Sequence, residues 1–229
     1  MRGEPDIAAA AALLADPTRA TLLMELVDGL ALPPSELAER ARVSRATASE
    51  HLAKLRDAGL VAVERGGRNR YYRIADPSVA SAIEAVAAIA RPRPVRSLRE
   101  ATRSEAIRAA RTCYGHLAGA TGVALADALL ERGLVVRQDD SIEVTDEGRE
   151  RLRTALGLEL PRAGTRASVG KPCNDWSERR PHVAGPLGVA ITRRLFEVGW
   201  IERIGSGRAV RVTPEGRRGL SEAFGAELP

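Results

Sequence analysis

Four side chains in the second half of this sequence belong to residue types that bind metal ions or act as nucleophiles. They form two cysteine–histidine pairs, Cys113 with His116 and Cys173 with His182. Thiolates and imidazoles are the ligands that Zn²⁺ takes in tetrahedral sites, so the two pairs together would supply one complete ligand set. The spacings within the pairs differ, C-x₂-H against C-x₈-H, and neither is a zinc-finger spacing.

Other interpretations of these four residues stay open. Arg111, Arg179 and Arg180 create an electropositive neighbourhood, which would suit thiols that sense oxidants or electrophiles. A small-molecule effector could occupy the space between the pairs. Alternatively, cysteine is a small buried apolar side chain, each histidine anchors its helix, and the recurrence is a relic of a duplication.

A second chemically suggestive stretch is PPSELAERARVSRATASEHLAKLRDAGLV, which starts at Pro33. It predicts a short helix capped by Ser35, a turn at residues 42–43, and a second helix capped by Ser44 and ended by Gly59. Three apolar residues recur at helical spacing on the second helix and would face a core: Ala48, Leu52 and Leu55.

The opposite face of this second helix is polar and partly basic. Such a face suits insertion into the major groove of DNA, so we interpret it as a recognition helix. Its predicted DNA contacts are Ser44, Arg45, Thr47, Ser49 and His51.

Two alternating segments follow the recognition helix and predict a hairpin. Residues 60–64 and 70–74 would be strands around a glycine-containing turn at 65–69. Three arginines near the tip would meet phosphates beside the groove: Arg65, Arg68 and Arg70.

The remaining elements of the first 90 residues are helical. Residues 5–15 are alanine-rich, and Asp16-Pro17 would start a second helix as N-cap and first residue. That helix has a buried stripe of Leu22, Leu23, Leu26 and Val27, and residues 77–90 predict another helix with apolar residues at helical spacing.

Composition narrows the function further. The chain has 229 residues, 44% of them hydrophobic but only 3% aromatic, so it can bury a core yet lacks the aromatics that stack on RNA bases. A formal net charge of +5 is compatible with a nucleic-acid partner. Two cysteines are too few for a disulfide scaffold, and no signal peptide or membrane span is visible. We expect a soluble, cytoplasmic protein with reduced thiols.

The first part of the chain resembles the ArsR/SmtB family of winged-helix bacterial regulators over residues of about 8–90. The resemblance lies in the Asp-Pro-Thr-Arg opening, the Ser-x-x-Thr-x-Ser-x-His-Leu helix, the Leu-Arg-Asp-Ala-Gly-Leu-Val exit and the wing ending Tyr-Tyr-Arg-Ile. It implies a dimer that pairs through helices 5–15 and 77–90, binds operator DNA, and releases it when an inducer binds.

The family's metal-sensing positions are not filled here. Some members carry Cys-x-Cys in the first helix of the motif, where this chain has Ser35–Ala41. Others place an Asp/His/Glu set on the last helix, where this chain offers Glu84 alone.

The chain is predicted to have two domains. Residues 1–90 form the DNA-binding and dimerisation domain, the Pro/Arg-rich stretch 91–98 is a linker, and 99–229 form a sensory domain. The sensory domain repeats itself at about 112–156 and 172–224: HLAGATGVALADALLERGLV aligns without a gap with HVAGPLGVAITRRLFEVGWI. Each copy predicts a helix, a glycine, two strands, and a helix capped by Thr145 or Thr213. The fold class is mainly α with small β wings (α+β), with two degenerate winged units in the second domain.

The segment between the repeats is less regular. Residues 157–171 are turn-rich and predict a surface connection. Asp175 and Glu178 could bind a cation or pair with Arg179 and Arg180, and pairing is the favoured interpretation. Trp176 would be a buried anchor or part of a lid over a ligand.

These features together predict a transcriptional repressor that binds a near-palindromic operator as a homodimer, with the second domain modulating DNA binding. Two alternatives are a thiol-dependent enzyme and a protein-interaction adaptor built on the Cys/His pairs. No phosphate-binding loop, nucleophile elbow or paired carboxylates support an enzyme. The arginine-rich wing argues against an adaptor.

Overall fold

The computed structural model describes residues 4–92, 94–161 and 169–229, and the chain divides into two compact units, Met1–Ile83 and Glu84–Pro229. The division falls inside helix α5 (Pro77–Ile89), a few residues before the predicted linker at 91–98. The two units are described separately.

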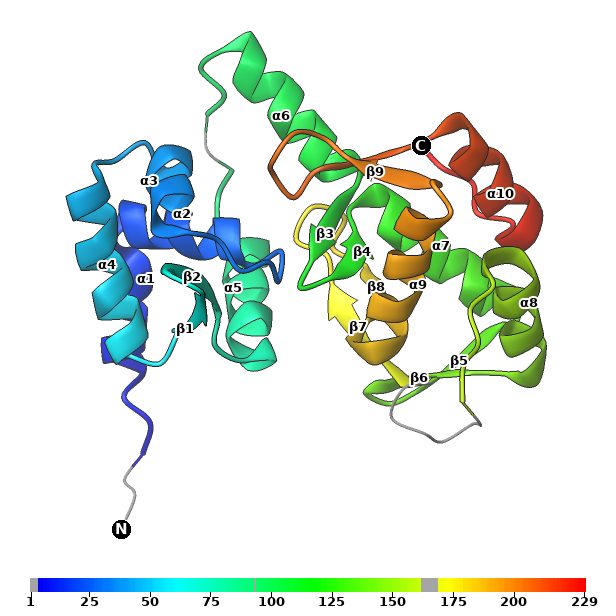
Figure 1. Cartoon of the computed structure of the whole chain (residues 1–229). Coiled ribbons are helices and arrows are strands. Elements are labelled where there is room, and N and C mark those ends of the chain that lie inside the picture. Colours follow the sequence, from blue (N-terminus) through cyan, green and yellow to red (C-terminus); the bar gives the residue numbers. More distant parts are fainter. Residues whose placement is uncertain (1–3, 93, 162–168) are drawn as a thin grey trace. The chain divides into compact units, whose positions relative to one another are not determined.

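The first unit has the helical order expected of a winged helix-turn-helix (Figure 1). Its elements are α1 (Ile7–Ala15), α2 (Pro17–Leu26), α3 (Pro34–Ala41), α4 (Arg45–Asp57), β1 (Val61–Gly66) and β2 (Asn69–Ile74). Helix α5 comes next and contains the division between the units.

The junction of α1 and α2 shows what the Asp-Pro-Thr-Arg run does. The Asp16 carboxylate accepts a hydrogen bond from the Arg19 backbone N–H at 2.9 Å, so it is the predicted N-cap of α2. The Arg19 guanidinium donates in the other direction, to the carbonyls of Leu13 and Ala12 at 2.8 Å, which satisfies the C-terminal end of α1. The motif therefore fastens two helices across a sharp bend.

The predicted apolar stripes of α2 and α4 are confirmed. Seven of the predicted residues are buried at 1% exposure or less: Leu22, Leu23, Leu26, Val27, Ala48, Leu52 and Leu55. Arg40 of α3 pairs with Glu25 of α2 at 3.1 Å, which adds a half-buried ion pair between these helices.

Of the two predicted helix caps, the one on α4 is confirmed and the one on α3 is wrong. Ser44 caps α4 as predicted, because its hydroxyl accepts from the Thr47 N–H at 3.0 Å, and Gly59 follows the helix at a φ of +74°. The prediction that Ser35 caps α3 is wrong. The N-cap is Pro33 without a side-chain hydrogen bond, because Pro34, whose ring fixes a helical φ, starts the helix two residues earlier than a Ser35 cap would.

The wing is a longer hairpin than predicted. Pairing runs from Val61↔Ile74 out to Gly66↔Asn69, which leaves a two-residue turn of Gly67 and Arg68. Gly67 has a φ of +59°, the conformation that tight hairpin turns require of glycine. A bridge between Leu32 and Tyr72 attaches the second wing strand to the segment before α3.

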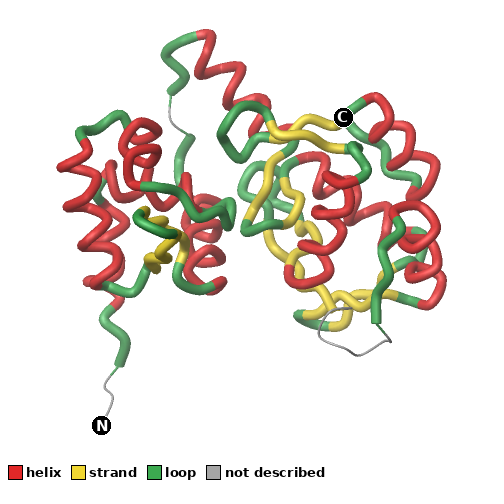
Figure 2. Tube along the Cα trace, viewed as in Figure 1, coloured by secondary structure: helices red, strands yellow, loops and turns green. Residues whose placement is uncertain are grey.

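The second unit alternates helices with short hairpins (Figure 2). Its elements are α6 (Leu98–Ala109), β3 (Arg111–Cys113), β4 (His116–Ala118), α7 (Ala120–Glu131), β5 (Val135–Gln138), β6 (Ser141–Val144), α8 (Asp146–Leu156), β7 (Val169–Asn174), β8 (Pro181–Ala184), α9 (Gly185–Glu197), β9 (Ile201–Arg203), β10 (Val210–Val212) and α10 (Pro214–Phe224).

The predicted succession of helix, glycine, two strands and helix is present twice, as α7 to α8 and as α9 to α10. The Thr145 and Thr213 hydroxyls cap the final helices by accepting from the N–H of Gly148 and Gly216, each at 3.0 Å. The two copies share one hydrophobic core, in which Leu129, Leu152, Leu187 and Phe224 are almost fully buried.

Several elements of this unit were not predicted. They are helix α6 and the hairpins β3–β4 and β7–β8, which come directly before α7 and α9. Of the expected surface connection 157–171, residues 162–168 lie outside the described part, but Val169 already pairs with β6, so the last part of that prediction is wrong. Strand β7 joins β5, β6 and β8 in a four-stranded sheet in the order β5-β6-β7-β8.

Among the described residues, no single helix has the length and apolar character needed to cross a membrane. Within the part of the chain that the structure describes, one bent pair, α1 with α2, meets those two criteria together, at a bend of 91°.

Candidate nucleic-acid interface and cysteine–histidine cluster

Helix α4 presents part of its predicted DNA-reading face to solvent. Ser44, Arg45 and Ser49 are exposed, whereas Thr47 is half-buried. The Thr47 hydroxyl lies 2.8 Å from the Ser44 hydroxyl, so these two residues bond each other at the helix start. Arg45 and Ser49 are thus the members of the set whose polar ends are most available to base edges.

His51 has a different environment from Arg45 and Ser49. Its side chain is 15% exposed, and Nδ1 lies 3.6 Å from an oxygen of Asp16, the N-cap of α2. It therefore packs α4 against the α1–α2 junction and offers less surface to a groove than Arg45 or Ser49.

The wing arginines carry charge that the protein leaves uncompensated. Arg65, Arg68 and Arg70 are exposed, and none of the three forms an ion pair among the residues the structure describes. Arg65 and Arg70 are also directly opposed across the hairpin, an arrangement of like charges that destabilises a strand pair. A wing built this way gains stability when an anion such as a phosphate lies beside it.

In the second unit, the Cys/His pairs occupy equivalent positions in two hairpins. Cys113 of β3 pairs in register with His116 of β4, and Cys173 of β7 pairs in register with His182 of β8. The spacings in the sequence differ only because the first hairpin has a two-residue turn and the second a longer loop. Cross-strand partners on one face place their Cβ atoms about 4.5–5.5 Å apart, close enough for the side chains to act together.

The structure brings the two pairs into one cluster. One potential ligand atom from each of the four residues lies within 4.8 Å of those of the other three, and His182 Nε2 is 3.1 Å from His116 Nδ1. Cys113, His116 and His182 are 2%, 5% and 0% exposed, and Cys173 is half-buried. We call this group the Cys/His cluster.

Two close helix contacts hold the cluster in place. Gly122 of α7 packs 3.7 Å from the Cβ of His182, and Gly188 of α9 packs 3.1 Å from the Cβ of His116, measured from the position of an added Cβ. Such an added Cβ would also lie 2.5 Å or less from the carbonyl oxygens of Leu117 and Val183. Each copy therefore supports the histidine of the other, and only glycine fits at either contact.

A buried ion pair lies next to the cluster. Asp175 accepts from the Arg111 guanidinium at 2.9 Å and from the Gly119 N–H at 2.6 Å, and it lies 3.5 Å from His182 Nδ1. This corrects the prediction that Asp175 pairs with Arg179 or Arg180. Arg180 instead bonds Asp127 at 2.8 Å on the surface. Sequence reasoning could not find the Arg111–Asp175 pair, since 64 residues separate its members.

Trp176 packs against this ion pair. The Arg111 guanidinium lies 4.7 Å from the centre of the indole ring, a cation–π contact, and the Ser177 hydroxyl lies 3.3 Å from the same guanidinium. The half-buried Trp176 therefore fits the anchor interpretation. Of the three arginines expected near the thiols, only Arg111 is buried here; Arg179 and Arg180 are exposed.

Protonation in the cluster follows from these contacts. A hydrogen bond between the thiols lowers the pKa of Cys173 to about 5, against the effect of burial and with help from His182. The same bond, together with burial, raises the pKa of Cys113 well above its ordinary value. Burial and the neighbouring His182 lower the pKa of His116 well below its ordinary value, so this imidazole is neutral.

The charge of Asp175 is also fixed by its surroundings. Burial raises the pKa of its carboxyl, but Arg111 and the hydrogen bonds from Ser177 and Gly119 outweigh this effect and hold the pKa well below its ordinary value. Asp175 is therefore an ionised acceptor beside His182.

Glu84, the acid noted on the last helix of the first domain, is not available as a ligand. It is the first residue of the second unit, is 2% exposed, and bonds Arg208 at 3.2 Å.

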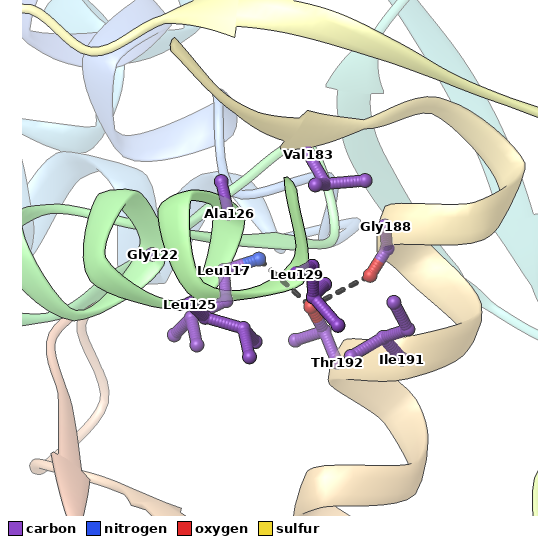
Figure 3. Close-up of a pocket in the computed structure, with 9 residues that line it drawn as sticks. All are labelled: Leu117, Gly122, Leu125, Ala126, Leu129, Val183, Gly188, Ile191 and Thr192. Atoms are coloured by element: carbon purple, nitrogen blue, oxygen red, sulfur yellow. Dashed lines mark hydrogen bonds between the residues drawn. The ribbon is translucent and has the colours of Figure 1, made fainter. Parts of the chain in front are cut away.

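The cavity between α7 and α9, next to the histidines, is too small for an organic effector. Figure 3 shows a cavity between α7 and α9, lined by apolar residues such as Leu125, Leu129 and Ile191, and its volume is about 10 Å³. Thr192 also lines it, and its hydroxyl accepts from the Leu117 N–H at 2.7 Å and donates to the Gly188 carbonyl at 2.8 Å. A volume of this size holds about one water molecule. A larger surface groove of about 460 Å³ lies along α8, α10 and Trp200.

Comparison with known proteins places this architecture among DNA-binding regulators. A family model described as a helix-turn-helix domain matches residues 14–64. The uncharacterized HTH-type transcriptional regulator YdfF of Bacillus subtilis is 43% identical over 214 residues, which cover 93% of this chain and 94% of that protein. The HTH-type transcriptional regulator CmtR of Mycobacterium tuberculosis is 41% identical over 70 residues, 31% of this chain and 58% of that protein.

Two solved structures are similar to the first part of the chain. One is the homodimeric winged helix-turn-helix domain of Mb0332 from Mycobacterium bovis, a possible ArsR-family regulator, with 30% identity over 38% of this chain and 86% of that chain at a TM-score of 0.33. The other is the cadmium sensor CmtR from M. tuberculosis, with 33% identity over 41% of this chain and all of that chain at a TM-score of 0.32. The chain belongs to the HTH-type transcriptional regulators, as its 43% identity with YdfF over nearly its whole length shows and as the ArsR/SmtB resemblance of its first part predicts.

Proposed function

We propose that this regulator is a repressor that binds a near-palindromic operator as a homodimer, reading bases with α4 and holding phosphates with the wing. The observation that carries the proposal is the exposed Arg45 and Ser49 of α4 in the same unit as three uncompensated wing arginines. Arginine forms two hydrogen bonds to guanine in the major groove, whereas arginine beside the backbone neutralises phosphates whatever the sequence.

Substituting one arginine of each kind separates the two roles. Arg45→Ala is expected to reduce the difference in binding free energy between operator and unrelated duplex by about 1–3 kcal/mol. Arg68→Ala is expected to weaken binding to both duplexes alike. It should also lower the magnitude of the slope of log K against log salt by about one for each wing. Gel shifts at several salt concentrations would measure both effects, and absence of duplex binding by the parent protein at low salt would refute the proposal.

The homodimer in this proposal rests on apolar side chains that the single chain leaves exposed. Helix α1 has no buried residue, and Ile7 is 76% exposed. On α5, Val86 and Ile89 are 46% and 85% exposed. These are the helices through which the family resemblance implies pairing, and burying each such side chain contributes about 1.5–3 kcal/mol.

Placing a charge on α5 should therefore weaken the dimer. We expect Ile89→Lys to raise the dimer dissociation constant about tenfold or more, because the ammonium group would enter an apolar interface. Ser78→Lys adds the same charge to an exposed position at the start of α5 and should change the constant little. Sedimentation velocity over a concentration series measures both variants, and equal dimerisation of the two would exclude α5 from the interface.

We further propose that the second unit modulates DNA binding. The first unit has no cysteine in α3, where some family members bind metal, while the Cys/His cluster lies in the second unit. We place the switch for DNA binding in this second unit, and the protein in the cytoplasm with its operator.

A further inference from the structure

The Cys/His cluster has a ligand set and a geometry that the DNA-binding function leaves unexplained. Two cysteines and two histidines come from equivalent cross-strand positions of two hairpins and meet within 4.8 Å. The convergence of four such residues in a protein with two cysteines and three histidines in all is the first observation that indicates a ligand.

The spacing of the nitrogen atoms fits a tetrahedral ion. Two nitrogens bound to one tetrahedral zinc ion at about 2.0–2.1 Å lie about 3.4 Å apart. His116 Nδ1 and His182 Nε2 are 3.1 Å apart, so they require only a small movement to share an ion.

The surroundings of His182 provide the second, independent observation. Its Nδ1 is fully buried without a hydrogen-bond partner, and it faces an oxygen of Asp175 at 3.5 Å. A histidine that binds metal through one nitrogen characteristically donates its other N–H to a carboxylate, which fixes the tautomer. Arg111 and the Gly119 N–H hold Asp175 in position for this.

The ligand types indicate the metal. Two thiolates with two neutral imidazoles are a soft-to-borderline set with a charge of minus two, which a divalent ion neutralises. Four protein ligands, three of them almost fully buried, leave no open position for a reacting molecule, and this is the pattern of structural rather than catalytic zinc sites.

We propose that one zinc ion binds in the second unit to four ligands: Cys113, His116, Cys173 and His182. Binding as two thiolates releases the thiol protons to solvent and joins hairpin β3–β4 to hairpin β7–β8. Asp175 is a positioning residue that orients the His182 ring. The ion thereby adds a metal link between the two copies of the repeated element, which also meet through apolar side chains and through hydrogen bonds of Thr192, Arg151 and Arg194.

The test is metal analysis of the full chain, produced without a polyhistidine tag and purified with a reductant but no chelator. Inductively coupled plasma mass spectrometry should find about one zinc ion per chain. Cys113→Ser and His182→Gln should each lose most of it. Tyr114→Phe, in the turn between Cys113 and His116, is the matched control and should keep it.

A second measurement covers the case in which the ligand variants fail to fold. The parent protein is stripped with a chelator and titrated with Co²⁺ alone, whose visible bands distinguish tetrahedral from octahedral coordination and whose thiolate charge-transfer band reports sulfur ligands. We expect intense tetrahedral bands that saturate at about one equivalent, and proton release on binding.

Three outcomes would overturn the proposal: a metal-free parent protein that shows no tetrahedral cobalt spectrum, zinc retained in both ligand variants, or a Cys113–Cys173 disulfide in the parent protein as purified under reductant. None of these outcomes depends on DNA binding, so the zinc site and the repressor function are tested independently.

Discussion

Replacing Arg111 with methionine is expected to lower the free energy of unfolding of the second unit by about 3–5 kcal/mol. Arg111 and Asp175 are both 0% exposed, and each is the other's partner at 2.9 Å. Removing the guanidinium leaves an ionised carboxylate in the interior with only hydrogen bonds to compensate it. The same substitution removes the cation–π contact with Trp176.

Urea unfolding followed by tryptophan fluorescence measures this effect selectively, because both tryptophans, Trp176 and Trp200, lie in the second unit. Arg180→Met is the control: it breaks the Arg180–Asp127 pair, which is 61% and 25% exposed, and should cost less than about 1 kcal/mol. The double variant Arg111→Met/Asp175→Asn should recover part of the loss. Equal stability of the Arg111 and Arg180 variants would contradict the role given to the buried pair.

Removing all three wing arginines should nearly abolish the electrostatic part of DNA binding. In a dimer, alanine at positions 65, 68 and 70 deletes six cations, so the slope of log K against log salt should fall in magnitude by about five, with a loss of about a hundredfold or more in affinity at low salt. The fold should be unchanged, since Arg65, Arg68 and Arg70 are exposed and the first and last of them repel each other across the hairpin.

A charge-matched control separates this effect from net charge. Alanine at three exposed arginines of the second unit, Arg153, Arg211 and Arg218, removes the same number of positive charges. Fluorescence anisotropy with a labelled duplex over a salt series would compare the two triple variants. If they lose affinity equally, the wing has no special position on the DNA.

The parts of the fold that local patterns specify could be predicted from the sequence. The Ser44 cap, the Ala48–Leu52–Leu55 stripe and Gly59 follow from helical spacing and backbone conformation within one element. The Ser35 error arose at the same level, because two prolines compete with a serine for the helix start and determine it.

The candidate site in the second unit depends on contacts that no local pattern contains. Its four residues could be listed from the sequence, but the spacings C-x₂-H and C-x₈-H concealed that both pairs are cross-strand partners. That equivalence appears only when the hairpin register is known. The bond between Arg111 and Asp175, and the packing of Gly122 and Gly188 against the histidines, likewise join residues far apart in the chain.

Selection of duplexes from a random-sequence pool with the full chain would test whether this regulator reads a twofold-symmetric operator as a dimer. We predict enrichment of an inverted repeat whose half-sites lie about one helical turn apart, 10–10.5 base pairs, or a multiple of it, and loss of that enrichment in Arg45→Ala. Recovery of duplexes without a shared motif, or of a single unpaired half-site, would contradict it.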